Sequence, residues 1–145
     1  MTVPSRISII TLGVADLERS TAFYHSLGWA KSPASMPVIT FFEMQGSMFG
    51  LYEWSSLADD AQVPAEGSGF RGVTLAMNLS SVADVDEVFA EWVSAGATPK
   101  VEPHTAFWGG YSSYVADPDG HLWELAHNPY ATIDDDGRLV MGGGA

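Results

Sequence analysis

Apolar residues in the first third of the chain recur at spacings typical of strands and, in one segment, of a helix. Residues 6–14 are rich in Ile and Val and predict a strand. Asp16 can cap a helix in which apolar residues recur at helical spacing until Gly28 supplies a stop. A short extended piece follows, and residues 38–53 predict a hairpin that turns at residues 45–47. The predicted order is βαβββ.

The same order begins again after residue 70. Ser81 can cap a second helix, with Asp84 in the capping-box position and Gly96 as its stop. A strong turn, Asp117-Pro118-Asp119-Gly120, separates the last two strands. The strands predicted around this helix are 71–79, 98–102, 111–116 and 121–127. A period of roughly 65 residues with room for only two copies predicts a duplicated module, not a solenoid.

This organisation predicts one α+β domain over residues 1–130, built from two βαβββ modules. The connector contains Pro64 and several Gly and Ser residues, and we expect one helical turn over residues 56–61. The end of the chain is acidic and then rich in glycine, which predicts a loose, solvated tail. The predicted boundaries are module one 5–54, connector 55–70, module two 71–130 and tail 131–145.

Composition narrows the class of partner. The chain has 145 residues, of which 46% are hydrophobic, and its formal net charge is −12. Six scattered basic residues and this acidity argue against binding to nucleic acid or to a membrane surface. The chain has no Cys, which excludes disulfides and thiolate metal ligands, and it has no apolar run of membrane-spanning length. We expect a cytoplasmic protein with no signal peptide.

Glu124 is the most distinctive candidate for a functional residue, because it interrupts an apolar strand. Alternation along the strand places Glu124 on one face with Leu122 and Ala126, and Trp123 with Leu125 on the other. If the Trp123 face packs under the helices, the carboxylate can serve as a general base or as an anchor for a ligand. A carboxylate held only for structure by Ser or Tyr hydroxyls is the alternative.

Two hydroxyl-bearing residues are expected beside Glu124. Pairing the last two strands across the Asp117–Gly120 turn places Ser113 opposite Glu124 and Tyr111 opposite Ala126. Because no His is adjacent to Ser113 in the sequence, we predict a binding hydroxyl and no nucleophilic triad. A serine that is satisfied locally within its strand is the alternative.

Aromatic residues provide candidate pocket walls. Trp108 lies in the sequence Phe-Trp-Gly-Gly-Tyr, in which glycines permit close approach of a ligand and aromatics offer flat apolar surfaces. The same string can instead plug the end of a barrel. Phe49 is a further candidate for pocket lining, with core packing or an interface as its alternative.

The four His residues match no common metal spacing. His121 and His127 share the face of Trp123 and not that of Glu124, and His25 is expected to be solvated on the first helix. The acidic run 134–136 lacks the alternating donors and distal Glu of a calcium loop.

Residues 13–24 (GVADLERSTAFY), the spacing to Leu-Gly-Trp, and residues 107–129 (FWGGYSSYVADPDGHLWELAHNP) resemble the vicinal-oxygen-chelate superfamily. That superfamily includes glyoxalase I, extradiol dioxygenases, fosfomycin-resistance enzymes and bleomycin-binding proteins. The resemblance covers about residues 5–130. It implies that each module forms half of an open, barrel-like cleft, and it suggests a homodimer.

The resemblance also implies where a metal would bind. Metal-dependent members carry His or Glu ligands on the first and fourth strands of each module. The corresponding positions here are Ile9, a position near Leu51 with Glu53 two residues on, Thr74, and Glu124. Ile cannot coordinate and a Thr hydroxyl is a poor ligand, so we predict no metal cofactor. Thr74 is kept as a candidate contact for substrate.

Three functions remain open at this point. The first is a glyoxalase/bleomycin-resistance-like protein that binds a small organic molecule in the cleft without the usual divalent metal. The second is a metal-dependent lyase, isomerase or dioxygenase of the glyoxalase type that uses Glu124 and Glu53. The third is a non-enzymatic drug-binding resistance protein, to which an acidic cleft would attract a cationic ligand. Whether the protein is an enzyme, and which molecule it binds, stay open.

Overall fold

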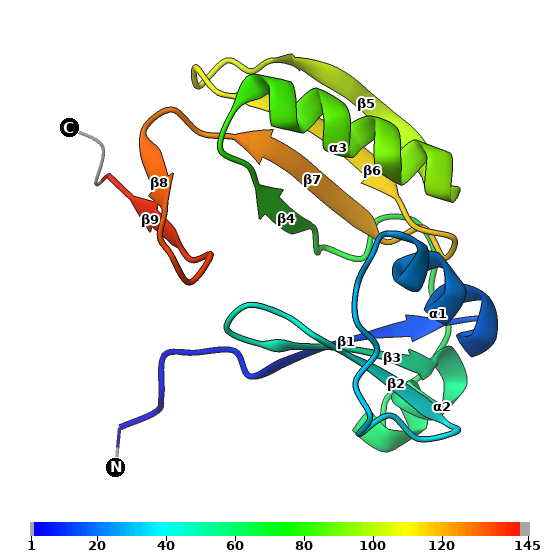
Figure 1. Cartoon of the computed structure of the whole chain (residues 1–145). Coiled ribbons are helices and arrows are strands. Elements are labelled where there is room, and N and C mark those ends of the chain that lie inside the picture. The colour runs from blue at the N-terminus through cyan, green and yellow to red at the C-terminus, as the bar shows by residue number, and fades with distance from the viewer. Residues whose placement is uncertain (1, 143–145) are drawn as a thin grey trace. The chain divides into compact units, whose positions relative to one another are not determined.

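The computed structural model describes residues 2–142, which form two compact units (Figure 1). The first unit ends at Gly67 and the second begins at Ser68. This boundary falls inside the predicted connector, and each unit contains one of the two predicted modules. The structure has the mixed α+β composition expected of paired glyoxalase-type modules, so the predicted fold class is confirmed.

The first unit is a three-stranded sheet with two helices. In the sheet order β1-β3-β2, β1 runs parallel to β3, and β2 forms the predicted antiparallel hairpin with β3. The extended piece after the first helix is not a full strand and makes two isolated bridges, from Lys31 to Phe42 and from Met36 to Ile39. The elements are β1 (Ile9–Val14), α1 (Leu17–Ser26), β2 (Ile39–Glu43), β3 (Met48–Glu53) and α2 (Trp54–Ala61).

An aromatic core holds α1 against this sheet. Asp16 caps the helix as predicted, because its carboxylate accepts a hydrogen bond from the backbone N–H of Arg19. The fully buried Tyr24 of α1 lies edge-on to Phe49 of β3, with ring centroids 4.9 Å apart, and stacks on Trp29 at 5.3 Å. Burial of these large rings stabilises the packing of the helix on the sheet.

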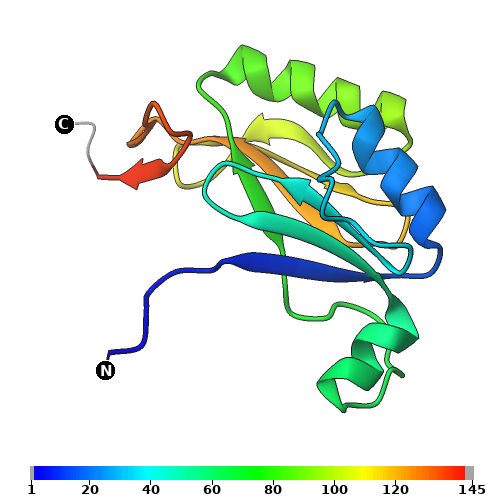
Figure 2. The ribbon, with the colours of Figure 1, turned by 60° about the horizontal axis from the view of Figure 1, so that its bottom comes forward.

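The second unit has a four-stranded sheet with one long helix and a separate hairpin. In the sheet order β4-β7-β6-β5, β4 runs parallel to β7 and the other neighbours are antiparallel. The helix α3 lies along one face of this sheet (Figure 2). The elements are β4 (Leu75–Asn78), α3 (Val82–Ala95), β5 (Thr98–Thr105), β6 (Tyr111–Ala116), β7 (Leu122–His127), β8 (Ala131–Ile133) and β9 (Leu139–Met141).

Both predicted ends of α3 are confirmed. The Ser81 hydroxyl accepts from the backbone N–H of Asp84 at 3.1 Å, and Gly96 ends the helix with a φ of +113°. Trp92 of α3 packs on Trp123 of β7, with ring centroids 5.2 Å apart. The Trp123 face of the sheet is therefore the face that the helix covers, which meets the condition set for Glu124 in the sequence analysis.

The turn between β6 and β7 has a different length from the predicted one. The structure pairs Asp117 with His121 through a backbone hydrogen bond of 2.9 Å, which leaves a three-residue loop. Gly120 ends this loop with a φ of +86°, as three-residue hairpin loops require. The predicted pairing across a two-residue loop is wrong by one residue, and a slip of one residue exchanges the two faces of β6.

Two further expectations are corrected. The connector helix is longer than one turn, because α2 begins at Trp54 directly after β3. The predicted loose tail over residues 131–145 is wrong for most of its length, since β8 and β9 form an antiparallel hairpin. Arg138 closes the hairpin loop by pairing with Asp134 at 3.3 Å and with Asp136. Residues 143–145 lie outside the described part of the chain.

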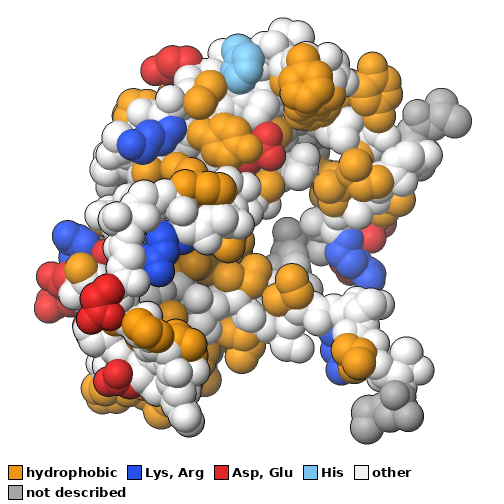
Figure 3. Space-filling view, turned by 180° about the vertical axis from the view of Figure 1, so that it is seen from behind, with side chains coloured by type: hydrophobic (Ala, Val, Ile, Leu, Met, Phe, Trp, Pro, Cys, Tyr) orange, Lys and Arg blue, Asp and Glu red, His pale blue; other side chains and the backbone are white. Residues whose placement is uncertain are grey.

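The surface carries few positive charges. On the side drawn in Figure 3, the Lys and Arg side chains are separated from one another and form no continuous basic stripe. Across residues 2–142, no helix combines the length and the apolar composition needed to cross a membrane.

Candidate functional site

Glu124 lies on the face of the second sheet that α3 does not cover. Its strand neighbours Trp123 and Leu125 are buried on the helix side, while Glu124 itself is partly exposed. Leu122 and Ala126 share its face, as the alternation along the strand predicts. We refer to this surface of the second unit as the Glu124 face.

One oxygen of the Glu124 carboxylate is held and the other is free. Ser112 of β6, which is only 4% exposed, donates its hydroxyl to Glu124 Oε2 at 2.7 Å. Glu124 Oε1 makes no hydrogen bond to any residue among 2–142. Because a short hydrogen bond to an ionised group is also a strong one, Ser112 fixes the orientation of the carboxylate. Oε1 therefore remains able to accept a hydrogen bond or a proton.

Tyr114 lies directly opposite Glu124 in the β6–β7 pairing. Partial burial raises the pKa of its phenol, and the nearby negative charge of Glu124 raises that pKa further. A hydrogen bond with the side chain of Thr74, just before β4, acts in the opposite direction. The phenol therefore stays protonated over the ordinary pH range and is available as a donor. We call Thr74, Ser112, Tyr114 and Glu124 the Glu124 cluster.

Ser113 and Tyr111 do not join this cluster, and their predicted positions beside Glu124 are wrong. Ser113 is fully buried on the α3 side, where its hydroxyl donates to the backbone carbonyl of Leu125 at 2.9 Å. Tyr111 lies opposite His127. Its phenol donates to Asp86 of α3 at 2.8 Å, and this hydrogen bond raises the pKa of the Tyr111 phenol. The three-residue loop at Gly120 is the physical reason for both errors.

Trp108 belongs to a closed loop between β5 and β6. Two backbone hydrogen bonds join Ala106 to Gly110 and Gly109 to Ala106, at 2.7 and 3.0 Å. The indole ring covers Gly110 so closely that a Cβ atom there would overlap it. The structure therefore gives Trp108 a packing role within the loop, and its predicted contact with a ligand stays a prediction.

Phe49 is a core residue, so its predicted role as a pocket wall is wrong. It is 2% exposed and is surrounded by Tyr24, Trp29 and Phe42 on the α1 side of the first sheet. The sequence alternation in β3 did not show which face the helix would cover.

The carboxylate of Glu53, the second metal-ligand candidate, is already engaged in hydrogen bonds at the start of α2. Its carboxylate caps α2 by accepting from the backbone N–H groups of Ser55 and Ser56, at 3.2 and 2.8 Å, and from the Ser56 hydroxyl. The hydrogen bonds from Ser56 are the main reason that the pKa of Glu53 is lowered. This arrangement is typical of a helix cap and not of a metal ligand.

The pairing of the strands identifies the counterpart of Glu124 in the first unit. In the second unit Glu124 lies opposite Ala76, two residues after the ligand position Thr74. In the first unit the residue two positions after Ile9 is Thr11, and it lies opposite Gly50. The position expected near Leu51 is therefore Gly50, and Leu51 itself is fully buried. A Cβ atom at Gly50 would meet Thr11 and Phe41 at 3.2 and 3.4 Å, so this position offers neither a ligand nor room for one.

The residues at the family's metal positions therefore do not fit a metal ion. Three of the four positions, Ile9, Gly50 and Thr74, carry no carboxylate or imidazole, and only Glu124 remains. Within residues 2–142, no three His, Asp or Glu side chains are grouped so that they could hold an ion.

A family model for the glyoxalase/bleomycin resistance protein/dioxygenase superfamily matches residues 6–125. The chain belongs to this superfamily. The resemblance to the vicinal-oxygen-chelate proteins is thereby confirmed. No curated protein that was compared with the chain matches it.

Solved glyoxalase-type structures are similar over most of the chain. A glyoxalase-related enzyme from Fulvimarina pelagi is 33% identical, covers 97% of this chain and 100% of its own, and has a TM-score of 0.86. A glyoxalase/bleomycin resistance protein/dioxygenase from Nocardioides is 27% identical, with 88% and 85% coverage and a TM-score of 0.72. A lactoylglutathione lyase from Agrobacterium tumefaciens is 23% identical, with 88% and 96% coverage and a TM-score of 0.66, and shares the fold.

The sequence did not predict two members of the Glu124 cluster, Ser112 and Tyr114. The position of Gly120 at the end of the turn is the sequence feature from which both residues could be predicted. A three-residue hairpin loop that ends in glycine pairs Tyr114 with Glu124, and it places Ser112 on the same face. Of the predicted site residues, the structure brings Thr74 and Glu124 together on this face.

Proposed function

We propose that this glyoxalase-superfamily protein binds a small organic molecule at the Glu124 cluster without the help of a divalent metal. The observation that carries the proposal is the asymmetric carboxylate, in which Ser112 holds Oε2 while Oε1 is free of hydrogen bonds to the described residues. A carboxylate fixed in this way accepts a hydrogen bond from a ligand at little entropic cost.

The other members of the cluster support recognition of a polar ligand. The Tyr114 phenol remains protonated and can donate to a ligand oxygen, while Glu124 accepts from a ligand hydroxyl or amine. The same carboxylate can remove a proton from a bound molecule, which is the chemistry expected of a general base. The likeness to a glyoxalase-related enzyme supports such a step without identifying its substrate.

The metal-dependent alternative has weaker support, because the residues at the metal positions do not fit an ion. Elemental analysis of the purified protein, followed by titration with Ni²⁺, Zn²⁺, Mn²⁺ and Fe²⁺, tests this part of the proposal directly. We expect no stoichiometric binding. Stoichiometric binding that disappears in Glu124→Ala would overturn the metal-free proposal and favour glyoxalase or dioxygenase chemistry.

Ligand binding is tested by an NMR screen of small aromatic and amphiphilic molecules that includes cationic compounds. We expect hits that shift the amide signals of Thr74, Ser112 and Tyr114, and a loss of affinity of about tenfold or more in Glu124→Gln. Ser113→Ala is the control, because it removes a buried hydroxyl from the neighbouring strand β6 on the opposite face of the same sheet. Binding that is unchanged in Glu124→Gln would contradict the proposal, and hits confined to cationic compounds would favour drug sequestration.

The superfamily resemblance also leads us to propose a homodimer. Size-exclusion chromatography with light scattering would measure a mass of twice 15.5 kDa if this is correct.

A further inference from the structure

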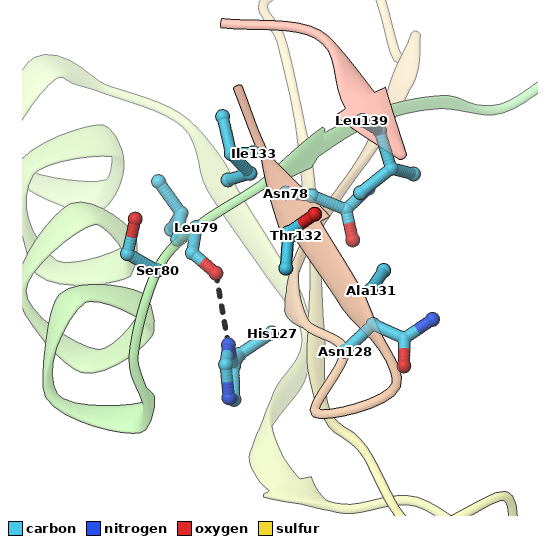
Figure 4. A pocket seen from close by; sticks show the side chains of 9 residues that line it. All are labelled: Asn78, Leu79, Ser80, His127, Asn128, Ala131, Thr132, Ile133 and Leu139. Atoms are coloured by element: carbon cyan, nitrogen blue, oxygen red, sulfur yellow. Dashed lines mark hydrogen bonds between the residues drawn. The ribbon is translucent and has the colours of Figure 1, made fainter. Parts of the chain in front are cut away.

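A pocket in the second unit lies apart from the Glu124 cluster. It has a volume of about 240 Å³ and is bounded by the end of β4, the end of β7 and the hairpin β8–β9 (Figure 4). Its lining includes none of the cluster residues Thr74, Ser112, Tyr114 and Glu124. An inference from this pocket therefore goes beyond the proposed function.

His127 is the fixed polar group of the pocket. Its Nδ1 lies 2.9 Å from the backbone carbonyl oxygen of Leu79, and the Leu79 N–H in turn donates to the carbonyl of Ala126 at 2.8 Å. Because a carbonyl oxygen can only accept, Nδ1 carries the ring proton. When the ring carries only this proton, Nε2 is an acceptor, and it has no hydrogen-bond partner among residues 2–142.

Three further polar side chains line the pocket without protein partners. The side chains of Asn78, Ser80 and Thr132 make no hydrogen bond to any other part of the described chain. They come from the end of β4, the loop before α3, and β8, so one small molecule in the pocket can reach groups on separate elements (Figure 4). Asn78 is half-buried, while Ser80 and Thr132 are exposed at the rim, so a bound molecule would meet polar groups both inside the pocket and at its mouth.

The remaining lining determines the chemistry of the ligand. Leu79, Ile133 and Leu139 give the pocket an apolar side. None of the described residues that line it is Asp, Glu, Lys or Arg, although the whole chain carries a formal charge of −12. An ion would therefore find no opposite charge there, whereas an uncharged molecule with an apolar body and a hydroxyl would satisfy both kinds of lining.

The volume sets the size of that molecule. A cavity of about 150 Å³ is large enough for benzene in another protein, so about 240 Å³ accepts a ring that carries a hydroxyl. We propose that this pocket is a second binding site for a small uncharged alcohol or phenol, whose hydroxyl donates a hydrogen bond to His127 Nε2.

Phenol is the probe for a first test, with ¹H–¹⁵N NMR of the full chain as the readout. Titration to about 20 mM is expected to shift the amide signals of Leu79, Ser80 and Thr132 saturably, with a millimolar dissociation constant. Toluene has the same shape without a donor and is expected to bind about three- to tenfold more weakly. Equal affinities for phenol and toluene would show that His127 Nε2 does not accept a hydrogen bond from the ligand hydroxyl.

The variant His127→Asn distinguishes the roles of the two ring nitrogens. The Asn side-chain amide can still donate to the Leu79 carbonyl, as Nδ1 does, whereas the Nε2 acceptor is lost. We expect this variant to weaken phenol binding about three- to tenfold. His25→Asn is the matched control, because His25 also contacts a backbone carbonyl through Nδ1, at 3.3 Å from Trp29, but lies on α1. Equal effects of the two substitutions would overturn the assignment.

Ala131→Leu provides a variant that does not depend on His127. The larger side chain fills part of the pocket from β8 and is expected to abolish the phenol-induced shifts. Shifts that persist unchanged in Ala131→Leu, or the absence of saturable shifts in the wild type, would show that the pocket is not a phenol site.

Discussion

Replacement of Phe49 by Ala should destabilise the first unit strongly, because the structure places this ring in the core. The ring is 2% exposed and lies 4.9 Å from Tyr24, 5.5 Å from Trp29 and 6.2 Å from Phe42 between centroids. Removing a buried Phe from such a cluster costs about 3–5 kcal/mol, since the apolar contacts are lost and a cavity remains. Three aromatic neighbours that cannot easily collapse favour the upper half of that range.

The assay is equilibrium unfolding in urea, followed by near-UV circular dichroism and tryptophan fluorescence. With a urea dependence of about 2 kcal/mol per molar, a loss of 4 kcal/mol lowers the midpoint by about 2 M. Phe49→Leu, which retains most of the volume, is expected to lose less than about 1.5 kcal/mol.

Phe41→Ala is the matched control for Phe49→Ala. Phe41 lies on the neighbouring strand but on the other face of the sheet, opposite Gly50, and it is only partly buried. We expect its replacement to cost less than about 2 kcal/mol. If Phe49→Ala cost no more than Phe41→Ala, Phe49 would not be a core residue, and its role as a pocket wall would be restored.

Three other predictions follow from individual contacts. The raised pKa of Tyr114 means that the unfolded chain loses this proton first, so stability should fall as the pH rises above about 10. Urea unfolding at pH 9–11 should show a shallower fall in Tyr114→Phe, and identical slopes would contradict the shift. The lowered pKa of Glu53 gives the opposite pH dependence of stability. The ionised Glu53 carboxylate stabilises the fold above the ordinary pKa range of Glu, and this stabilisation is lost as the pH falls through the lowered pKa. Glu53→Gln should therefore flatten the fall in stability between about pH 5 and pH 3, and a parallel curve would argue against the α2 cap. Gly110→Ala should displace the Trp108 ring, because the new Cβ would overlap it, and should alter the near-UV spectrum. That change should vanish in a Trp108→Phe background, and its persistence there would assign it to another residue.

Most helices and strands follow from short-range sequence patterns, and the sequence predicts these elements well. Asp16 and Ser81 satisfy backbone N–H groups within one helical turn, so the side chain alone marks where each helix begins. The buried face of β7 is also predictable from a local pattern. Trp123 and Leu125 alternate with Glu124, so only the side that carries Trp123 and Leu125 can be buried.

Pairing between strands depends on details that the pattern did not contain. The Asp117–Gly120 turn was recognised, but its loop length depends on the left-handed conformation of Gly120 and on the bond between Asp117 and His121. One additional loop residue moved Ser113 to the helix side and brought Ser112 to Glu124. The exact composition of the candidate site therefore required the structure.

The C-terminal hairpin was missed because its composition suggests a solvated segment. Asp134 organises the loop by accepting from the backbone N–H groups of Asp136 and Arg138, at 3.0 and 2.8 Å, and by pairing with the Arg138 side chain. Acidic residues that appear dispensable in a composition count thus form the turn itself. The pocket beside His127 depends on this hairpin and was not predictable.

The parallel pairing of β4 with β7 also determines the order in which the second unit can assemble. β6 and β7 are joined by a three-residue loop, whereas β4 and β7 are separated in the sequence by a helix and two strands. The pairing of Ala76 with Glu124 therefore closes a much longer loop of chain. Closing the shorter loop costs much less chain entropy, so the β6–β7 hairpin can form early and β4 must dock late. The strand that carries the edge of the Glu124 face is consequently the one expected to open first, and amide hydrogen exchange should be faster in β4 than in β6.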